Sequence, residues 1–112
     1  LRFAYYYHDQ RHILDHVATH EIAHSWTGNE VTCSNWSNLW LNEGFTVFEE
    51  RKISSFQHGE DFATIEMLLG SQDLAGDITN FGPTNSYTSL NPIFNGANPD
   101  DAFSEVPYEK GF

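Results

Sequence analysis

The chain has 112 residues, a length that fits a single domain. Hydrophobic residues make up 39% and aromatic residues 15% of the sequence, which is too much for a disordered chain. Five basic against sixteen acidic residues give a net charge of −11, which argues against binding to nucleic-acid backbones or anionic membranes. No run of 18 apolar residues is present, so we predict no membrane span. The single cysteine, Cys33, excludes an internal disulfide.

The first quarter of the chain carries a strand signal followed by a helix signal. Residues 1–7 place apolar side chains at every second position, which predicts a short N-terminal strand. Asp9 is a candidate N-cap for a helix from about residue 10 to residue 26. Gly28 lies just past that helix, as a C-terminal stop signal does.

The remainder of the chain predicts two more helices and then irregular structure. A second helix starts between Asn38 and Asn42 and runs to about Phe56, and a third covers residues 60–70. Residues 71–100 hold five Asn, three Gly and three Pro, which predicts a long irregular segment with turns at Asn95-Gly96 and Asn98-Pro99. Near the end of the chain, Pro107 suits the first position of a short helix. The predicted fold class is mainly α.

The strongest chemical signal is the H-E-x-x-H pattern of residues 20–24. Positions four apart on a helix lie about 40° apart around its axis, so His20 and His24 can meet one ion. Zinc is typically bound by two neutral imidazoles and a carboxylate, with the fourth position left to water. Glu21 projects from the same turn, where it can act as the general base that takes a proton from that water.

A third ligand is available 18 residues after His24, at Glu43 of the sequence Asn42-Glu43-Gly44. A second helix packed against the first can present this carboxylate to the ion. Glu50 lies seven positions further along, about 20° from Glu43 in helical projection. We expect Glu50 either to hold an imidazole N–H of a zinc ligand, fixing its tautomer, or to be a surface carboxylate.

Two other classes of zinc peptidase are excluded by the spacing. A metzincin needs glycine at position 27 and histidine at position 30, where this chain has Thr27 and Glu30. Thermolysin-type endopeptidases use a different spacing and place an acidic residue four positions after the glutamate ligand. That position is Val47 here.

A resemblance to a known family lies in two stretches, HEIAHSWTGNEVT and WLNEGFTVFEERKI. They closely resemble the zinc aminopeptidase family, the gluzincins that include leukotriene A4 hydrolase. The run SWTGN of residues 25–29 resembles the leukotriene A4 hydrolase and aminopeptidase B branch. The ending VPYEKGF strengthens the resemblance, because the family has a tyrosine 65 residues after its glutamate ligand, where this chain has Tyr108. The resemblance implies the helical part of a thermolysin-like catalytic domain.

The resemblance also implies roles for individual side chains. Zinc is bound by His20, His24 and Glu43, and Glu21 polarises the attacking water. Tyr108 donates a hydrogen bond to the oxyanion of the tetrahedral intermediate. Asp100 matches the aspartate with which leukotriene A4 hydrolases direct water onto the opened epoxide. Its alternative interpretation is a turn aspartate after Pro99.

Several family features are missing or changed in the chain. The family's Gly-x-Met-Glu-Asn segment, which grips the substrate's amino group, would lie just before Leu1. Phe103 stands where leukotriene A4 hydrolases carry a tyrosine, and Glu30 replaces a residue that is usually apolar. We expect residues 1–112 to be a partial zinc metallopeptidase catalytic domain that lacks an N-terminal β domain and a C-terminal helical domain.

Five of the six histidines recur every four residues, at positions 8, 12, 16, 20 and 24. Their faces turn by about 40° at each step, so they cannot all share one ion. His16 and His20 are candidates for chelating a second metal ion, with solvated histidines as the alternative.

The zinc-binding pattern predicts a zinc hydrolase with one Zn2+ per chain, and the family resemblance implies a zinc-dependent aminopeptidase. Its expected substrates are peptides, its expected location is the cytoplasm, and no nucleic-acid partner is expected. Hydrolysis of a fatty-acid epoxide at the same zinc is a second enzymatic hypothesis. An inactive zinc-binding fragment with a binding or structural role is the alternative from another class.

Overall fold

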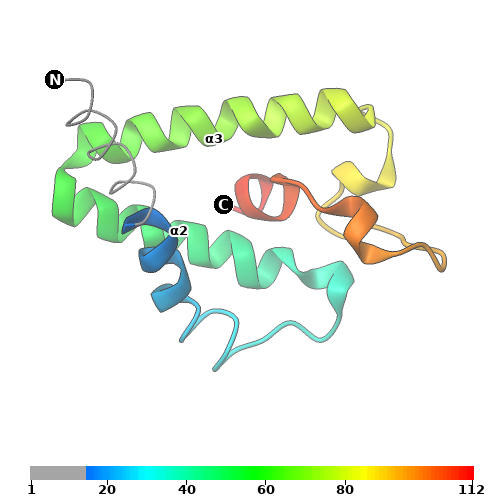
Figure 1. Ribbon diagram of the computed structural model, residues 1–112, viewed down its shortest axis with the longest axis horizontal. Coiled ribbons are helices and arrows are strands. Elements are labelled where there is room, and N and C mark those ends of the chain that lie inside the picture. The colour runs from blue at the N-terminus through cyan, green and yellow to red at the C-terminus, as the bar shows by residue number, and fades with distance from the viewer. Residues whose placement is uncertain (1–14) are drawn as a thin grey trace, which may run out of the picture.

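The computed structural model describes residues 15–112, and its largest feature is a pair of long antiparallel helices (Figure 1). Helix α2 spans Trp40–His58, helix α3 spans Glu60–Phe81, and Gly59 alone joins them. Residues 15–23 form a further helix, which packs against α2 through its histidines. The predicted strand over residues 1–7 and the start of the first helix lie outside the described residues.

The described part of the chain is mainly α, as its sequence predicts. Between residues 15 and 112 the only β pairing is one isolated bridge between Thr27 and Val31. Helix α2 follows a 3-10 turn at Trp36–Asn38 and matches the predicted second helix closely. No helix within residues 15–112 is both long and apolar enough to cross a membrane.

The first helix ends at Ala23, three residues before the predicted end. The amides of Ser25 and Trp26 bond to carbonyls three residues back, at 3.0 Å each, which tightens and closes the last turn. The chain then reverses, because Gly28 has φ 131° and the amide of Val31 returns to the carbonyl of Trp26 at 3.0 Å. His24 therefore stands in this turn rather than inside the helix.

The third helix is longer than predicted, since α3 continues through residues 71–81 that were assigned to the irregular segment. The misleading signal was the Gly, Asp and Asn content of this stretch. Leu74, Ile78 and Phe81 recur at helical spacing and are all half-buried. Phe81 makes an edge contact with Tyr87, with ring centroids 5.8 Å apart. Tertiary packing of this stripe outweighs the weak helix propensity of its neighbours.

The irregular segment begins at residue 82 and folds back toward the helices. It contains short 3-10 turns at Ser86–Thr88 and Pro99–Ala102 and the predicted turn at Asn95-Gly96, whose φ angles are 47° and 83°. The chain then enters a π-helical turn, Val106–Lys110, with a proline at its start as predicted. This C-terminal turn lies between α2 and α3 (Figure 1).

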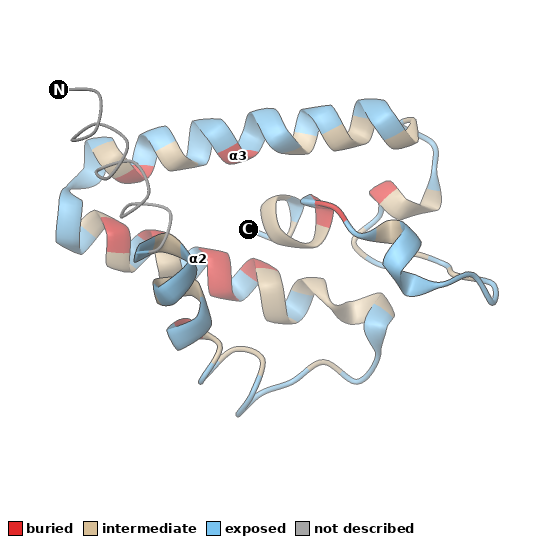
Figure 2. Cartoon of the chain, in the orientation of Figure 1, coloured by how far each residue is buried: buried red, intermediate tan, exposed pale blue. Residues whose placement is uncertain are grey.

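The face that α2 buries is built from small and polar residues. They are Gly44, Thr46, Val47, Arg51 and Ser54. Figure 2 shows these buried positions on the middle of α2, next to the first helix and the C-terminal turn. Small residues allow the first helix and the C-terminal turn to approach the α2 backbone closely, and this close approach brings the residues of the site together.

Candidate metal centre

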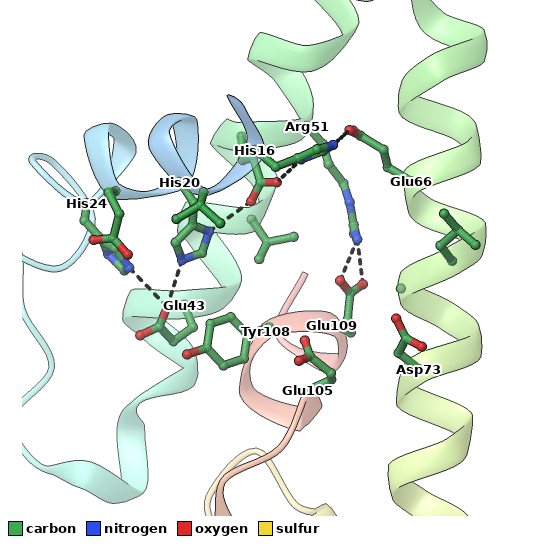
Figure 3. A pocket seen from close by; sticks show the side chains of 16 residues that line it. His16, His20, His24, Glu43, Arg51, Glu66, Asp73, Glu105, Tyr108 and Glu109 are labelled. Carbon is green, nitrogen blue, oxygen red and sulfur yellow. Dashed lines mark hydrogen bonds and ion pairs between the residues drawn. The ribbon is translucent and has the colours of Figure 1, made fainter. Parts of the chain in front are cut away.

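Three side chains predicted as zinc ligands converge on one point. Single donor atoms of His20, His24 and Glu43 all lie within 4.8 Å of one another. One carboxylate oxygen of Glu43, Oε2, is 3.2 Å from Nε2 of His20 and 3.1 Å from Nε2 of His24 (Figure 3). The 18 residues between His24 and Glu43 therefore allow the end of the first helix to lie next to the first turn of α2.

The donor set and its spacing fit a zinc ion. Two imidazole nitrogens and one carboxylate oxygen are typical of catalytic zinc sites that keep a position open to water. A tetrahedral ion with ligands about 2.0–2.1 Å away holds neighbouring ligand atoms about 3.3 Å apart. The two Glu43 distances, 3.1 and 3.2 Å, are close to that value. All three residues also line a cavity of about 480 Å³, which leaves room for water and substrate.

His24 is oriented by the turn that follows the first helix. Its Nδ1 donates to the backbone carbonyl of Thr27 at 2.8 Å, so the lone pair of Nε2 faces Glu43. The hydroxyl of Thr46 lies 3.1 Å from the same Nδ1 and 2.7 Å from the Thr27 hydroxyl. A side chain at Gly28 would place a Cβ 2.6 Å from His24 Nδ1, so glycine is required there by both contact and φ.

Glu50 contacts His20 at the ring nitrogen that faces away from Glu43. Oε2 of Glu50 lies 2.9 Å from Nδ1 of His20, which leaves Nε2 facing Glu43. Burial disfavours the charged imidazolium, but the hydrogen bonds to Glu43 and Glu50 outweigh it and raise the pKa of His20 to about 9. Burial also opposes ionisation of Glu50, yet the bonds to His16 and His20 lower its pKa to about 2. The cluster thus strongly favours bound positive charge.

The predicted general base, Glu21, and the predicted oxyanion donor, Tyr108, lie at the same cavity. Glu21 lines its wall and is exposed to solvent, and the ring centroid of Tyr108 lies 5.9 Å from that of His20. In Figure 3 the Tyr108 ring extends from the C-terminal turn toward Glu43. Burial raises the pKa of Tyr108 to about 12, with a further contribution from the negative charges of Glu43 and Glu105. Tyr108 is therefore a hydrogen-bond donor at neutral pH.

The C-terminal turn that carries Tyr108 is tied to α2 by a buried ion pair. Nη2 of Arg51 donates to both carboxylate oxygens of Glu109, at 2.6 and 2.7 Å. Arg51 is only 8% exposed, and its guanidinium lies 4.2 Å from the centroid of the Phe112 ring. The pair fixes the residue next to Tyr108, and so helps to fix the position of its ring relative to the predicted metal ligands.

A second cavity, of about 470 Å³, is also lined by Tyr108. Its lining is mainly apolar, with Trp36, Trp40, Leu90, Phe94 and Phe103 among the contributing side chains. Glu43 and Tyr108 reach this cavity too, and Asp100 lies in its wall. Asp100 is exposed at the start of the 3-10 turn Pro99–Ala102, where its amide bonds to the Asn98 side chain at 3.2 Å.

Several contributing residues were not predicted from the sequence. The Thr27 carbonyl has no sequence signal, because every residue carries one. Thr46 was detectable in principle, since it follows Glu43 by three positions on the same helix. The second metal ion considered for His16 and His20 stays untested. Among residues 15–112, His20, His24 and Glu43 form the one group of at least three side chains whose donor atoms all lie within 4.8 Å of one another. His16 and His20 bind opposite oxygens of Glu50.

A comparison with known protein families matches residues 4–112 to the peptidase family M1 domain. The chain belongs to peptidase family M1. The resemblance drawn from the H-E-x-x-H and N-E-G stretches is thereby confirmed, and with it membership of a family of hydrolases.

The chain is similar to relatives that carry two different names, leucine aminopeptidase 2 and leukotriene A-4 hydrolase. It is 46% identical over 96 residues to leucine aminopeptidase 2 of Neosartorya fischeri and 50% identical over 96 residues to leukotriene A-4 hydrolase of Xenopus laevis. Each alignment covers 86% of this chain and 16% of the relative. The chain thus spans about one sixth of the length of these curated M1 proteins.

A solved structure of an M1 protein has the same fold as the described residues. Yeast leukotriene A4 hydrolase in complex with bestatin superposes with a TM-score of 0.81 at 45% identity, covering 87% of this chain and 16% of that one. The native Saccharomyces cerevisiae enzyme gives the same TM-score at 46% identity. The predicted fold class, the helical part of a gluzincin-like catalytic domain, is confirmed by this match.

Proposed function

We propose that the chain carries the catalytic centre of a zinc-dependent aminopeptidase, with His20, His24 and Glu43 as zinc ligands. The observation that carries this proposal is the meeting of these three donors at a cavity that Glu21 and Tyr108 also line. Bound zinc would act as a Lewis acid that makes water a nucleophile near neutral pH and polarises the substrate carbonyl. The relatives named as aminopeptidases support removal of N-terminal residues.

Glu21 is the proposed general base. It follows His20 directly, lines the cavity and is exposed, so that a water molecule and a peptide bond in the cavity can both reach its carboxylate. It accepts a proton as the water oxygen bonds to the carbonyl carbon. It then returns this proton to the amide nitrogen, so that the C–N bond breaks and the amine leaves neutral.

Tyr108 is the proposed oxyanion donor. Its phenol is protonated at neutral pH, and burial and nearby carboxylates raise its pKa further. A hydrogen bond from this phenol becomes stronger as the carbonyl oxygen gains negative charge, so it stabilises the transition state more than the substrate. Glu50 holds His20 and the Thr27 carbonyl holds His24, so both ligands present Nε2 without rearrangement.

Glu21→Gln in the full-length protein tests this proposal. The variant keeps the size of the side chain and is expected to retain one zinc per chain while losing hydrolysis of aminoacyl p-nitroanilides by about 100-fold or more. Metal content and turnover are measured on the same preparation. Glu60→Gln is the matched control, because Glu60 lies on α3 and bonds to Ser55, away from the cavity. Full turnover in Glu21→Gln, or full activity of protein stripped of metal by a chelator, would contradict the proposal.

Hydrolysis of a fatty-acid epoxide is a second candidate function. The specific observation is the apolar cavity beside Tyr108, which also reaches Glu43 and places Asp100 in its wall. An acyl chain fits such a lining, and the relative named leukotriene A-4 hydrolase supports this substrate class. The test is product formation from leukotriene A4, with Asp100→Asn as the comparison. Absence of a dihydroxy acid with the unmodified enzyme would eliminate this function.

A further inference from the structure

His16 joins three helices through two carboxylates on its opposite sides. Its Nδ1 lies 2.8 Å from Oε1 of Glu50 on α2, and its Nε2 forms an ion pair with Oε1 of Glu66 on α3 (Figure 3). The other oxygen of Glu50 holds His20 at 2.9 Å. An unbroken chain of contacts therefore runs from Glu66 through His16 and Glu50 to a proposed zinc ligand.

The contacts of His16 indicate which of its protonation forms is favoured. Nδ1 of His16 donates a hydrogen bond to the Glu50 carboxylate, and the negative charge of Glu66 beside Nε2 further favours the protonated imidazolium form. The hydrogen bond to Glu50 is the main cause that raises the pKa of His16, against the opposing effect of burial. The charged form of His16 is thus favoured between Glu50 and Glu66.

His16 is the ion-pair partner of a largely buried carboxylate, that of Glu66. The side chain of Glu66 is 10% exposed, against 31% for His16. Both Glu66 carboxylate oxygens are buried, and neither receives a hydrogen bond of good geometry. A carboxylate in this position is costly unless a cation stands beside it. The pair therefore anchors His16 from α3, and His16 in turn faces Glu50.

The orientation of the Glu50 carboxylate depends on both of its histidine partners. With His20 alone, one oxygen would be bound and the carboxylate could rotate about its last side-chain bond. With His16 on the second oxygen, the carboxylate plane is fixed at two points. A fixed plane fixes the direction of the His20 Nδ1–H bond, and hence the direction in which Nε2 points toward Glu43.

We propose that His16 and Glu66 are positioning residues for the metal centre, which lock Glu50 so that it holds His20 ready to bind zinc. This inference rests on the proposed function, since it takes His20 as a ligand. Neither His16 nor Glu66 touches the proposed metal or the reacting atoms. They act through Glu50, and their effect is expected first in metal affinity.

The test is zinc affinity of the full-length protein, measured by competition with a chromophoric chelator. Removing only one member would leave a buried charge unpaired, so the informative variant is His16→Leu/Glu66→Leu, which replaces the pair by apolar side chains. Glu50→Gln serves as the reference for a direct partner of a ligand, whose loss typically weakens metal binding by about 10–100-fold. Glu60→Gln on α3 is the matched control, with unchanged affinity expected.

We expect the His16→Leu/Glu66→Leu variant to weaken zinc binding by roughly three- to tenfold, less than a direct partner does. The d–d absorption of the Co2+-substituted protein should also change, which a purely structural role would not produce. In the Glu50→Gln background, the same two substitutions should have no further effect on affinity, because the contact through which they act is already lost. This coupling distinguishes positioning from a general loss of stability.

The two proposals fail in different ways. If the unmodified protein binds no zinc, the proposed function fails and takes this inference with it. If it binds zinc, and His16→Leu/Glu66→Leu has the same dissociation constant and Co2+ spectrum as the unmodified protein, only the positioning role is refuted. The positioning role is also refuted if His16→Leu/Glu66→Leu lowers zinc affinity by the same factor in the unmodified protein and in the Glu50→Gln background.

Discussion

Replacing Gly44 by alanine tests whether close approach of two backbones positions the proposed oxyanion donor. Gly44 is buried on α2, next to the proposed ligand Glu43, and faces Gly111 just past the C-terminal turn. A Cβ at position 44 would lie 2.6 Å from the carbonyl carbon of Gly111 and 2.7 Å from its Cα. Both are backbone atoms, so no side-chain rotation can relieve the contact.

The size of the effect follows from these distances. Ordinary contacts of a Cβ begin at 3.4 Å, so Gly111 must move away from α2 by about 0.8 Å. Overpacking of this kind costs about 1–3 kcal/mol of unfolding free energy. Tyr108 lies three residues before Gly111 in the same tight turn and moves with it. A displacement of about 1 Å at a catalytic group can lower the rate by roughly 100-fold.

We therefore expect Gly44→Ala to lower kcat/KM for peptide hydrolysis by about 10- to 100-fold while zinc content stays at one per chain. Turnover of an aminoacyl p-nitroanilide and urea unfolding are the two assays. Gly76→Ala is the matched control, because a Cβ at position 76 of α3 would meet nothing within 4 Å. Alanine there should leave turnover unchanged and add up to about 1 kcal/mol of stability. Unmodified kcat/KM and stability in Gly44→Ala would refute the reasoning.

Three further substitutions test other contacts of the site. Tyr108→Phe should lower kcat by about 100- to 1000-fold with little change in KM, and an unchanged steady-state kcat would rule out the oxyanion role. Arg51→Met should cost about 3–5 kcal/mol in urea unfolding because Glu109 stays buried without its cation, and Arg51→Met/Glu109→Leu should recover most of this loss. Thr46→Val removes the hydroxyl that lies 3.1 Å from His24 Nδ1, and it should weaken zinc binding about tenfold in chelator competition. Zinc affinity equal to that of the unmodified protein would show that the Thr27 carbonyl alone is enough to orient His24.

The local part of the candidate site was predictable because helical geometry relates position to direction. His20 and His24 are four residues apart, so their meeting on one side of the first helix follows from about 100° per residue. Glu50 lies seven positions after Glu43, so one face of α2 carries both carboxylates. The contact of Glu50 with His20 confirms the geometric expectation, whereas its role stays a prediction.

The end of the first helix and the length of the third were predicted less well, for opposite reasons. The first helix closes early because hydrogen bonds within residues 22–31 turn the chain back, and these bonds involve backbone groups that all residue types share. Helix α3 continues past residue 70 because Ile78 and Phe81 are packed against other parts of the structure. Composition over residues 71–81 reports the propensity of each residue but not this packing.

The sequence by itself determined the H-E-x-x-H pattern, Glu43 as the candidate third ligand, the mainly α fold and the family. These features depend on residue types at short, regular spacing, which a linear pattern records. Only the tertiary structure decided that Tyr108 stands beside His20, and that Glu66 of α3 is joined to His20 through His16 and Glu50. Such contacts link residues up to 88 positions apart. They exist because small residues on α2 let the first helix and the C-terminal turn pack closely on the same face of α2. The spacing of residues along the chain does not record how closely these elements approach each other.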